Sequence, residues 1–93
     1  MKLFTIVLDY QGGTYLWQAE SNSIEELCVQ LDEAINWSTL PLSIPKRTIT
    51  QFMSDIRSSR PVALDGLRNA WCMSAMLGKK LAILHLIETS AET

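Results

Sequence analysis

The stretch that decides the fold is residues 71–87, WCMSAMLGKKLAILHLI. Two apolar runs flank a two-residue turn at Gly78-Lys79, which predicts an antiparallel hairpin over about residues 68–89. In the register of that turn, Cys72 lies directly opposite His85. One face of the hairpin then carries the residues that we expect to pack beneath helices: Trp71, Met73, Ala75, Leu77, Ala82, Leu84 and Leu86.

The opposite face of the same hairpin is too apolar for a surface that faces water. It carries Cys72, Ser74, Met76, Leu81, Ile83, His85 and Ile87. Apolar patches of this kind mark sites of association. We therefore predict an interface that uses this face and the edge strands, for a homodimer or for another protein, made by Cys72, Met76, Leu81, Ile83 and Ile87. The alternative is that residues 90–93 or the 38–47 loop fold across the patch.

A second hairpin is predicted at the N-terminus. Residues 3–9 are apolar and β-branched, Gly12-Gly13 is a turn signal, and residues 14–20 alternate. A two-residue turn at Gly12-Gly13 would pair Tyr10 with Tyr15, Leu8 with Trp17 and Ile6 with Ala19. One side then gathers the apolar residues Phe4, Ile6, Leu8, Tyr10, Tyr15, Trp17 and Ala19. The other side collects Thr5, Val7, Asp9, Gln18 and Glu20.

Two helices are predicted between the hairpins. Residues 23–26, Ser-Ile-Glu-Glu, have the form of a capping box, and an apolar stripe follows at helical spacing as far as Trp37. The prolines of residues 38–45 indicate a loop. A second stripe predicts a helix over residues 45–58. Residues 62–66 indicate a short extended piece and a tight turn at Asp65-Gly66.

The order of these elements predicts one α+β domain over residues 1–93. Its topology would be ββ-α-α-ββ, with a four-stranded antiparallel sheet and both helices on one face. The 93 residues are 47% apolar and 19% charged, which is typical of a globular protein. No apolar run is long enough to span a membrane, and the N-terminus has no signal-peptide pattern. We therefore expect a cytoplasmic protein without a membrane partner.

The two cysteines and the one histidine limit the chemistry that the chain can perform. No CxxC or Cys/His spacing of a zinc site is present, so we expect no metal and no cofactor. Cys28 lies in the apolar stripe of the first helix, which favours core packing. Cys72 opposite His85 is the minimum of a nucleophilic pair, although no third residue orients the histidine and no loop supplies an oxyanion donor. We favour a non-enzymatic role, with a small-ligand or thiol-based site near Cys72 and His85, or in a cleft beside Trp37 and Trp71, as an alternative.

Charge is sorted along the chain. Residues 1–45 hold one base against six acids, whereas residues 46–80 hold seven bases against two acids. A further alternative is therefore that the basic segment binds nucleic acid or another anion through Arg57, Arg60 and Arg68. The net charge of −2 and the absence of a recognition motif do not favour nucleic acid. The simpler explanation is that the two signs lie on different faces of one fold.

Two resemblances add to these expectations. Gly12-Gly13-Thr14-Tyr15, Asn69-Ala70-Trp71-Cys72, residues 78–82 and Glu88-Thr89 together resemble a small uncharacterised bacterial family with these hairpin motifs. That resemblance covers nearly the whole chain and implies a bacterial source. Residues 3–37 resemble the start of HicB-type antitoxins, on the same Gly-Gly-Thr-Tyr strand and the helix start at residues 23–27. This second resemblance implies a strand–strand–helix arrangement for that part of the chain.

Overall fold

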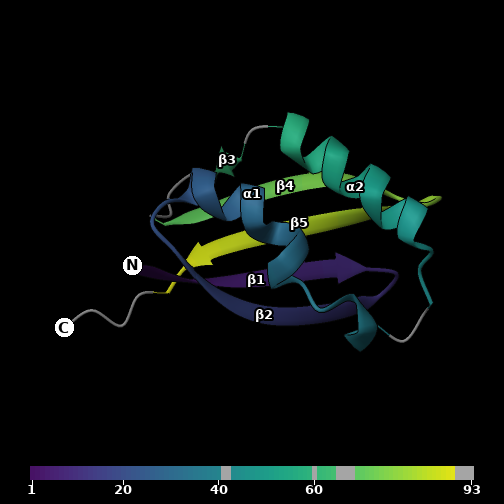
Figure 1. Ribbon diagram of the computed structural model, residues 1–93, viewed down its shortest axis with the longest axis horizontal. Helices are drawn as coiled ribbons and strands as arrows, with labels where there is room; N and C mark the ends of the chain where they lie inside the picture. Colours follow the sequence, from purple (N-terminus) through teal and green to yellow (C-terminus); the bar gives the residue numbers. More distant parts are fainter. Residues whose placement is uncertain (41–42, 60, 65–68, 90–93) are drawn as a thin grey trace.

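The computed structural model describes residues 1–40, 43–59, 61–64 and 69–89. The described elements are β1 (Lys2–Tyr10), β2 (Gly13–Ser21), α1 (Ile24–Ala34), the 3-10 helix η1 (Trp37–Thr39), α2 (Lys46–Ser58), β3 (Val62–Ala63), β4 (Ala70–Leu77) and β5 (Lys80–Glu88). The strands form one antiparallel sheet in the order β2-β1-β5-β4-β3. Both α1 and α2 pack on one face of it (Figure 1). The predicted α+β class is confirmed.

The sheet has five strands, so the prediction of four was wrong. The additional strand is β3, which pairs Val62 with Cys72 and Ala63 with Trp71. The chain that leaves α2 returns along the open edge of β4, where it satisfies backbone groups that would otherwise face only water. This pairing turns a two-residue extended piece into a strand. The predicted turn at Asp65-Gly66 lies outside the described residues.

The register of the first hairpin differs from the prediction by two residues. The turn is formed by Gln11 and Gly12, with φ of 49° and 79°, and Tyr10 pairs with Gly13. Gly13 therefore begins β2, where the Tyr15 ring lies over it: a Cβ at Gly13 would lie 2.5 Å from the Tyr15 hydroxyl oxygen. A slip of two residues keeps every side chain on its face, so the predicted sorting of the two faces still holds.

The second hairpin has the predicted register. Gly78 and Lys79 form its turn, and the φ of 72° at Gly78 suits the first position of a primed turn. All the predicted pairs are present: Leu77 with Lys80, Ala75 with Ala82, Met73 with Leu84, Trp71 with Leu86 and Cys72 with His85.

The two hairpins meet at the centre of the sheet, where β1 pairs with β5. Val7 lies opposite His85 and Asp9 lies opposite Ile83. The Tyr10 hydroxyl donates a buried hydrogen bond of 2.7 Å to the carbonyl of Leu77, 67 residues away. The hairpins are therefore held together along the strands and also near their turns.

The helices begin where the sequence predicts. The Ser23 side chain caps α1 by accepting a hydrogen bond of 3.2 Å from the Glu26 amide. Helix α1 ends at Ala34, earlier than the predicted end near Trp37. Trp37 is instead the first residue of η1. Helix α2 follows Pro45, as expected for a proline at the start of a helix.

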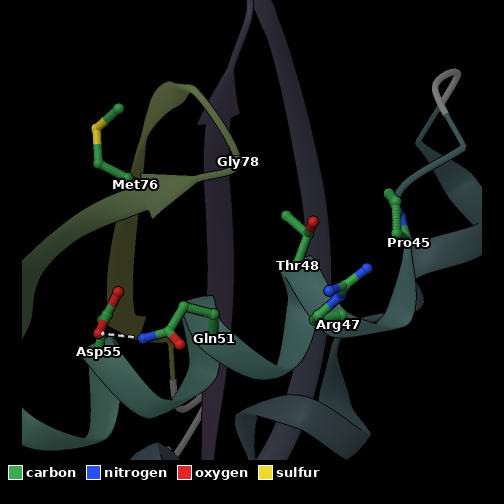
Figure 2. Close-up of a pocket in the computed structure, with 7 residues that line it drawn as sticks. All are labelled: Pro45, Arg47, Thr48, Gln51, Asp55, Met76 and Gly78. Atoms are coloured by element: carbon green, nitrogen blue, oxygen red, sulfur yellow. Dashed lines mark hydrogen bonds between the residues drawn. The ribbon is translucent and has the colours of Figure 1, made fainter.

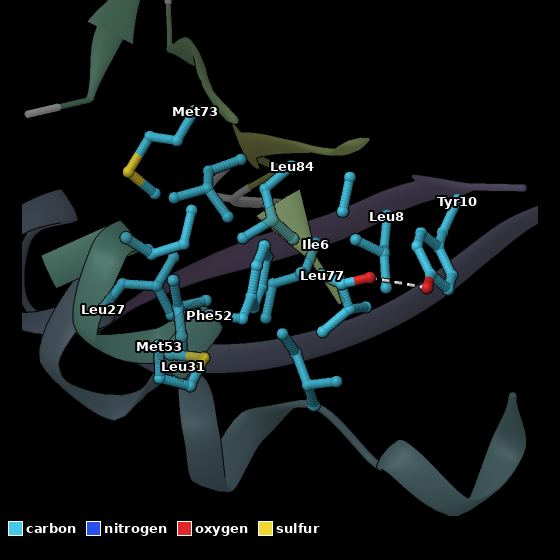
Figure 3. Packing of buried hydrophobic residues seen from close by; sticks show 14 of the residues in the cluster. Ile6, Leu8, Tyr10, Leu27, Leu31, Phe52, Met53, Met73, Leu77 and Leu84 are labelled. Carbon is cyan, nitrogen blue, oxygen red and sulfur yellow. Dashed lines mark hydrogen bonds between the residues drawn. The ribbon is translucent and has the colours of Figure 1, made fainter. Parts of the chain in front are cut away.

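The core lies between the sheet and the two helices (Figure 3). Fully buried side chains come from both hairpins and both helices: Phe4, Ile6, Leu8, Leu27, Leu31, Phe52, Ile56, Leu77, Ala82, Leu84 and Leu86. Trp37 meets Phe52 edge to face, with ring centroids 6.0 Å apart, and Trp71 tilts against Phe4 at 6.3 Å. Trp17 and Trp71 pack against the core as predicted, and Trp37 does so as well. The helices thus protect one side of the sheet, and the other side is where a site must be sought.

Candidate functional site

The outer sheet face consists of the strand side chains that point away from α1 and α2. Its register aligns residues of all five strands in one row: Leu16, Val7, His85, Cys72 and Val62. A second row holds Thr14, Asp9, Ile83 and Ser74, and a third holds Gln18, Thr5, Ile87 and Ala70. Leu81 and Met76 form a pair beside the second row. The five residues of the predicted interface therefore lie on one face: Cys72, Met76, Leu81, Ile83 and Ile87.

This outer sheet face is apolar and open to solvent. Val62 is 64% exposed, Leu16 63%, Leu81 54% and Met76 48%. Several residues between them, among them Val7, Ile83 and His85, are partly buried by their neighbours. Single exposed apolar side chains are common on proteins, but a contiguous set across several strands is not.

The prediction from the sequence found only the part of this face that belongs to the last hairpin. The structure extends it onto β1 and β2 through Val7 and Leu16, and onto β3 through Val62. The alternation of β1 had placed Val7 on the outward side of its own hairpin. Only the pairing of β1 with β5 brings that residue beside His85.

A polar contact lies in the middle of the apolar face. The His85 Nε2 atom is 3.2 Å from Oδ2 of Asp9, and both side chains are partly exposed. The Thr14 hydroxyl donates a hydrogen bond of 2.8 Å to the other carboxylate oxygen. Asp9 is thus held by Thr14 and in turn orients His85, so the expectation that no third residue orients the histidine was wrong. Asp9 and His85 are 76 residues apart in sequence, so no local pattern could have predicted their contact.

Cys72, His85 and Asp9 together supply a thiol, an imidazole and an orienting carboxylate. In the described part of the chain, however, no hydrogen bond joins the Cys72 thiol to His85. Both helices lie on the other face of the sheet, and a helix start is the usual source of backbone donors for an oxyanion. A shallow cleft of about 390 Å³ beside Cys72 is lined by uncharged residues: Ser59, Val62, Leu64, Met73 and Ser74. Among the described residues, the arrangement provides an imidazole beside a carboxylate in an apolar surface, and no helix start lies on this face to donate to an oxyanion.

The Cys28 thiol should react more slowly in the folded protein than in the unfolded chain. Burial, and after it the charge of Glu25, raise the pKa of the Cys28 thiol. Because the thiolate is the nucleophile, iodoacetamide should modify Cys28 more slowly in the folded protein than in denaturant, and faster as pH rises. Mass spectrometry of digests taken over time follows Cys28 and Cys72 in the same sample. Equal rates at Cys28 with and without denaturant would contradict the expectation.

The proposed anion site is described only in part. Arg57 is exposed in the last turn of α2, whereas Arg60 and Arg68 lie outside the described residues. Arg47 lies at the other end of α2, roughly 15 Å from Arg57 by the rise of the helix. These two cations therefore do not converge on one point.

Arg47 instead lines a cleft between α2 and the β4–β5 hairpin (Figure 2). The cleft has a volume of about 450 Å³ and includes Thr48, Met76 and Gly78. Its other charged side chain is Asp55, which accepts a hydrogen bond of 3.0 Å from Gln51. One cation beside one carboxylate gives the cleft no net positive charge to hold an anion.

Within residues 1–40, 43–59, 61–64 and 69–89, no three His, Cys, Asp or Glu side chains lie close enough together to hold a metal ion. Among the helices described, none is both long and apolar enough to cross a membrane.

Comparison with known proteins identifies no relative of this chain. No protein-family model, no curated protein and no solved structure matches the chain. The two resemblances seen in its sequence therefore stay predictions.

Proposed function

We propose that this protein is a non-enzymatic interaction module that associates with a second copy of itself through the outer sheet face. The observation that carries this proposal is the contiguous set of exposed apolar side chains on one face of the sheet, among them Leu16, Val62, Met76 and Leu81. Both helices pack on the opposite face, so neither of them covers this one, while residues 90–93, the alternative cover, lie outside the described residues. Removing such side chains from water is the main driving force of association.

The face is large enough to form the greater part of a dimer interface. The four long strands have eight or nine residues each. With strands ~4.8 Å apart and a rise of ~3.3 Å per residue, the face measures on the order of 500 Å² in projection, and its corrugation adds to that. A standard interface buries about 800 Å² per partner. The outer sheet face approaches this value without help from the rest of the surface.

The charges of the face favour a second copy over a charged partner. Asp9 lies at its centre and is already in contact with His85, and Glu20 lies at the far end of the edge strand β2. The side chains between them are apolar or uncharged, so the face offers nothing specific to a strongly basic or acidic protein. A two-fold contact brings the same apolar patch of each copy together, which is the commonest arrangement of homo-oligomers.

Native mass spectrometry of the purified protein over a range of concentrations tests this proposal. We expect a mass that is an even multiple of the 10.5 kDa chain. The fraction of the protein with that mass should grow as the concentration rises. A single chain at every concentration would contradict self-association. A stable complex with a different polypeptide would also contradict it, since the face would then belong to that protein.

A further inference from the structure

We infer that strand β2 pairs antiparallel with β2 of a second copy, so that the sheets of two protomers become one continuous sheet. In the described part of the chain, β2 lies at the edge of the sheet and pairs with β1 alone. It is nine residues long, whereas β3 at the opposite edge has two. This contact uses the edge and not the outer sheet face, so it does not depend on the dimer proposed above.

The backbone of β2 presents a row of unused hydrogen-bonding groups. Tyr10 and Gly13 flank the two-residue turn and form a hydrogen-bonded pair, and such pairs alternate along an antiparallel ladder. The residues whose N–H and C=O groups point away from β1 are therefore Thr14, Leu16, Gln18 and Glu20. In the described part of the chain, no backbone hydrogen bond outside the strand ladders uses these groups. Groups at this spacing are matched by another β-strand.

The edge of β2 also lacks the features that keep sheet edges apart. Natural edge strands carry lysine, proline or a bulge that prevents pairing. From Gly13 to Ser21 the sequence has no proline and no basic residue, and its register with β1 is unbroken. Glu20 is the single charged residue of the strand. The structure is therefore open to strand addition at this edge along the whole length of β2.

The side chains of β2 are complementary to a second copy of the same strand. A two-fold axis at Leu16 places Leu16 opposite the partner's Leu16, with the outward backbone groups of both facing each other. In this register Tyr15 lies opposite the partner's Trp17, and Thr14 opposite the partner's Gln18. Aromatic residues thus meet aromatic residues, and such cross-strand pairs stabilise sheets. Glu20 lies beside the partner's Gly12, so no two like charges face each other.

A concave site lies beside the centre of this predicted contact. A cleft of about 430 Å³ is lined by Leu16, Trp17 and Gln18 of β2 together with Thr5 of β1. The Gln18 amide donates a hydrogen bond of 3.2 Å to the Thr5 hydroxyl, which holds the side chain along the cleft. Leu16 lies on the proposed two-fold axis and Trp17 lies next to it, so the cleft adjoins the centre of the predicted contact.

The variant Gln18→Pro tests the inference. Proline removes an N–H that points away from β1, so the ladder between β1 and β2 stays intact while the new pairing loses a central bond. Gln18→Ala is the matched control, because it loses the same side-chain bond to Thr5 and keeps the amide. We expect Gln18→Pro to have half the native mass of the wild type or less, and Gln18→Ala to keep the wild-type mass. An unchanged mass for a folded Gln18→Pro, verified by circular dichroism, would overturn the inference.

Hydrogen exchange of individual amides separates this contact from the outer sheet face. The Leu16 and Gln18 amides should exchange at least about tenfold more slowly at high protein concentration than at low concentration, because the partner strand protects them. The same protection should persist in Ile83→Lys, which places a charge on the outer face alone. Fast exchange at both amides at every concentration would overturn strand pairing, even if the protein were a dimer. Protection that appears only with a foreign polypeptide in the complex would overturn the choice of a second copy.

Discussion

Ile83→Lys is expected to weaken association through the outer sheet face about 100-fold, so that native mass spectrometry shows half the wild-type mass or less at concentrations where the wild type is assembled. Ile83 is partly buried in the middle of the face, in the row that also contains Asp9 and Ser74. A lysine there must lose its water when two copies meet, and a penalty of ~3 kcal/mol corresponds to that factor.

Lysine is a better choice than aspartate at this position because of the register. Ile83 lies directly opposite Asp9, and two like charges directly opposite each other destabilise a sheet. An aspartate could therefore unfold the protein instead of only separating the copies. A lysine lies opposite a carboxylate, and the fold of the single chain is retained.

A matched control comes from the helical side of the molecule. Val29 is 69% exposed on α1, so Val29→Lys introduces the same charge without touching the outer sheet face or the edge of β2. We expect this variant to keep the wild-type mass. If both lysine variants dissociate, the added positive charge weakens association wherever it is placed, and the result does not identify the outer sheet face as the interface. If Ile83→Lys is folded and keeps the wild-type mass, the outer sheet face is not an interface.

Phe52→Ala is expected to cost ~3–5 kcal/mol in the free energy of unfolding, which is the range for a fully buried aromatic residue. Phe52 has no exposed surface, and Trp37 packs against it edge to face. A domain of this size has a total stability of roughly 5–15 kcal/mol. The variant should therefore be close to the limit of folding, with a midpoint of urea unfolding far below that of the wild type.

The measurement is urea denaturation followed by circular dichroism, at one fixed protein concentration because assembly also contributes to stability. Thr50→Ala serves as the control, since Thr50 is an exposed residue of the same helix and should change stability by less than about 0.5 kcal/mol. A loss below about 1 kcal/mol for Phe52→Ala would show that α2 does not cover the core in the way the structure describes.

The sequence by itself determined the elements whose signal is local. The Gly78-Lys79 turn between two apolar runs was sufficient for the register of the last hairpin, and every predicted pair is present. The Ser23 cap and Pro45 determined the starts of the two helices. In each case neighbours within a few residues carry the whole pattern, so the chain needs no distant contact to specify it.

Tertiary structure decided the register of the first hairpin. Two glycines in a row offer two turns, and the sequence does not distinguish Gln11-Gly12 from Gly12-Gly13. The Tyr15 ring needs the space above Gly13, which places that glycine in the strand. Both turns keep the same residues on each face, which is why the predicted core of this hairpin was correct although its pairs were not.

Tertiary structure also decided the composition of the outer sheet face. The residues of the last hairpin were predictable because the pleat alone sends alternate side chains to opposite faces. The contact of Asp9 with His85 and the addition of Val7 and Leu16 depend on β1 lying beside β5, and Val62 depends on β3 lying beside β4. Strand order is set by how the apolar faces of two distant hairpins are buried under the same helices. This burial is a property of the whole core, so no local period in the sequence predicts the strand order.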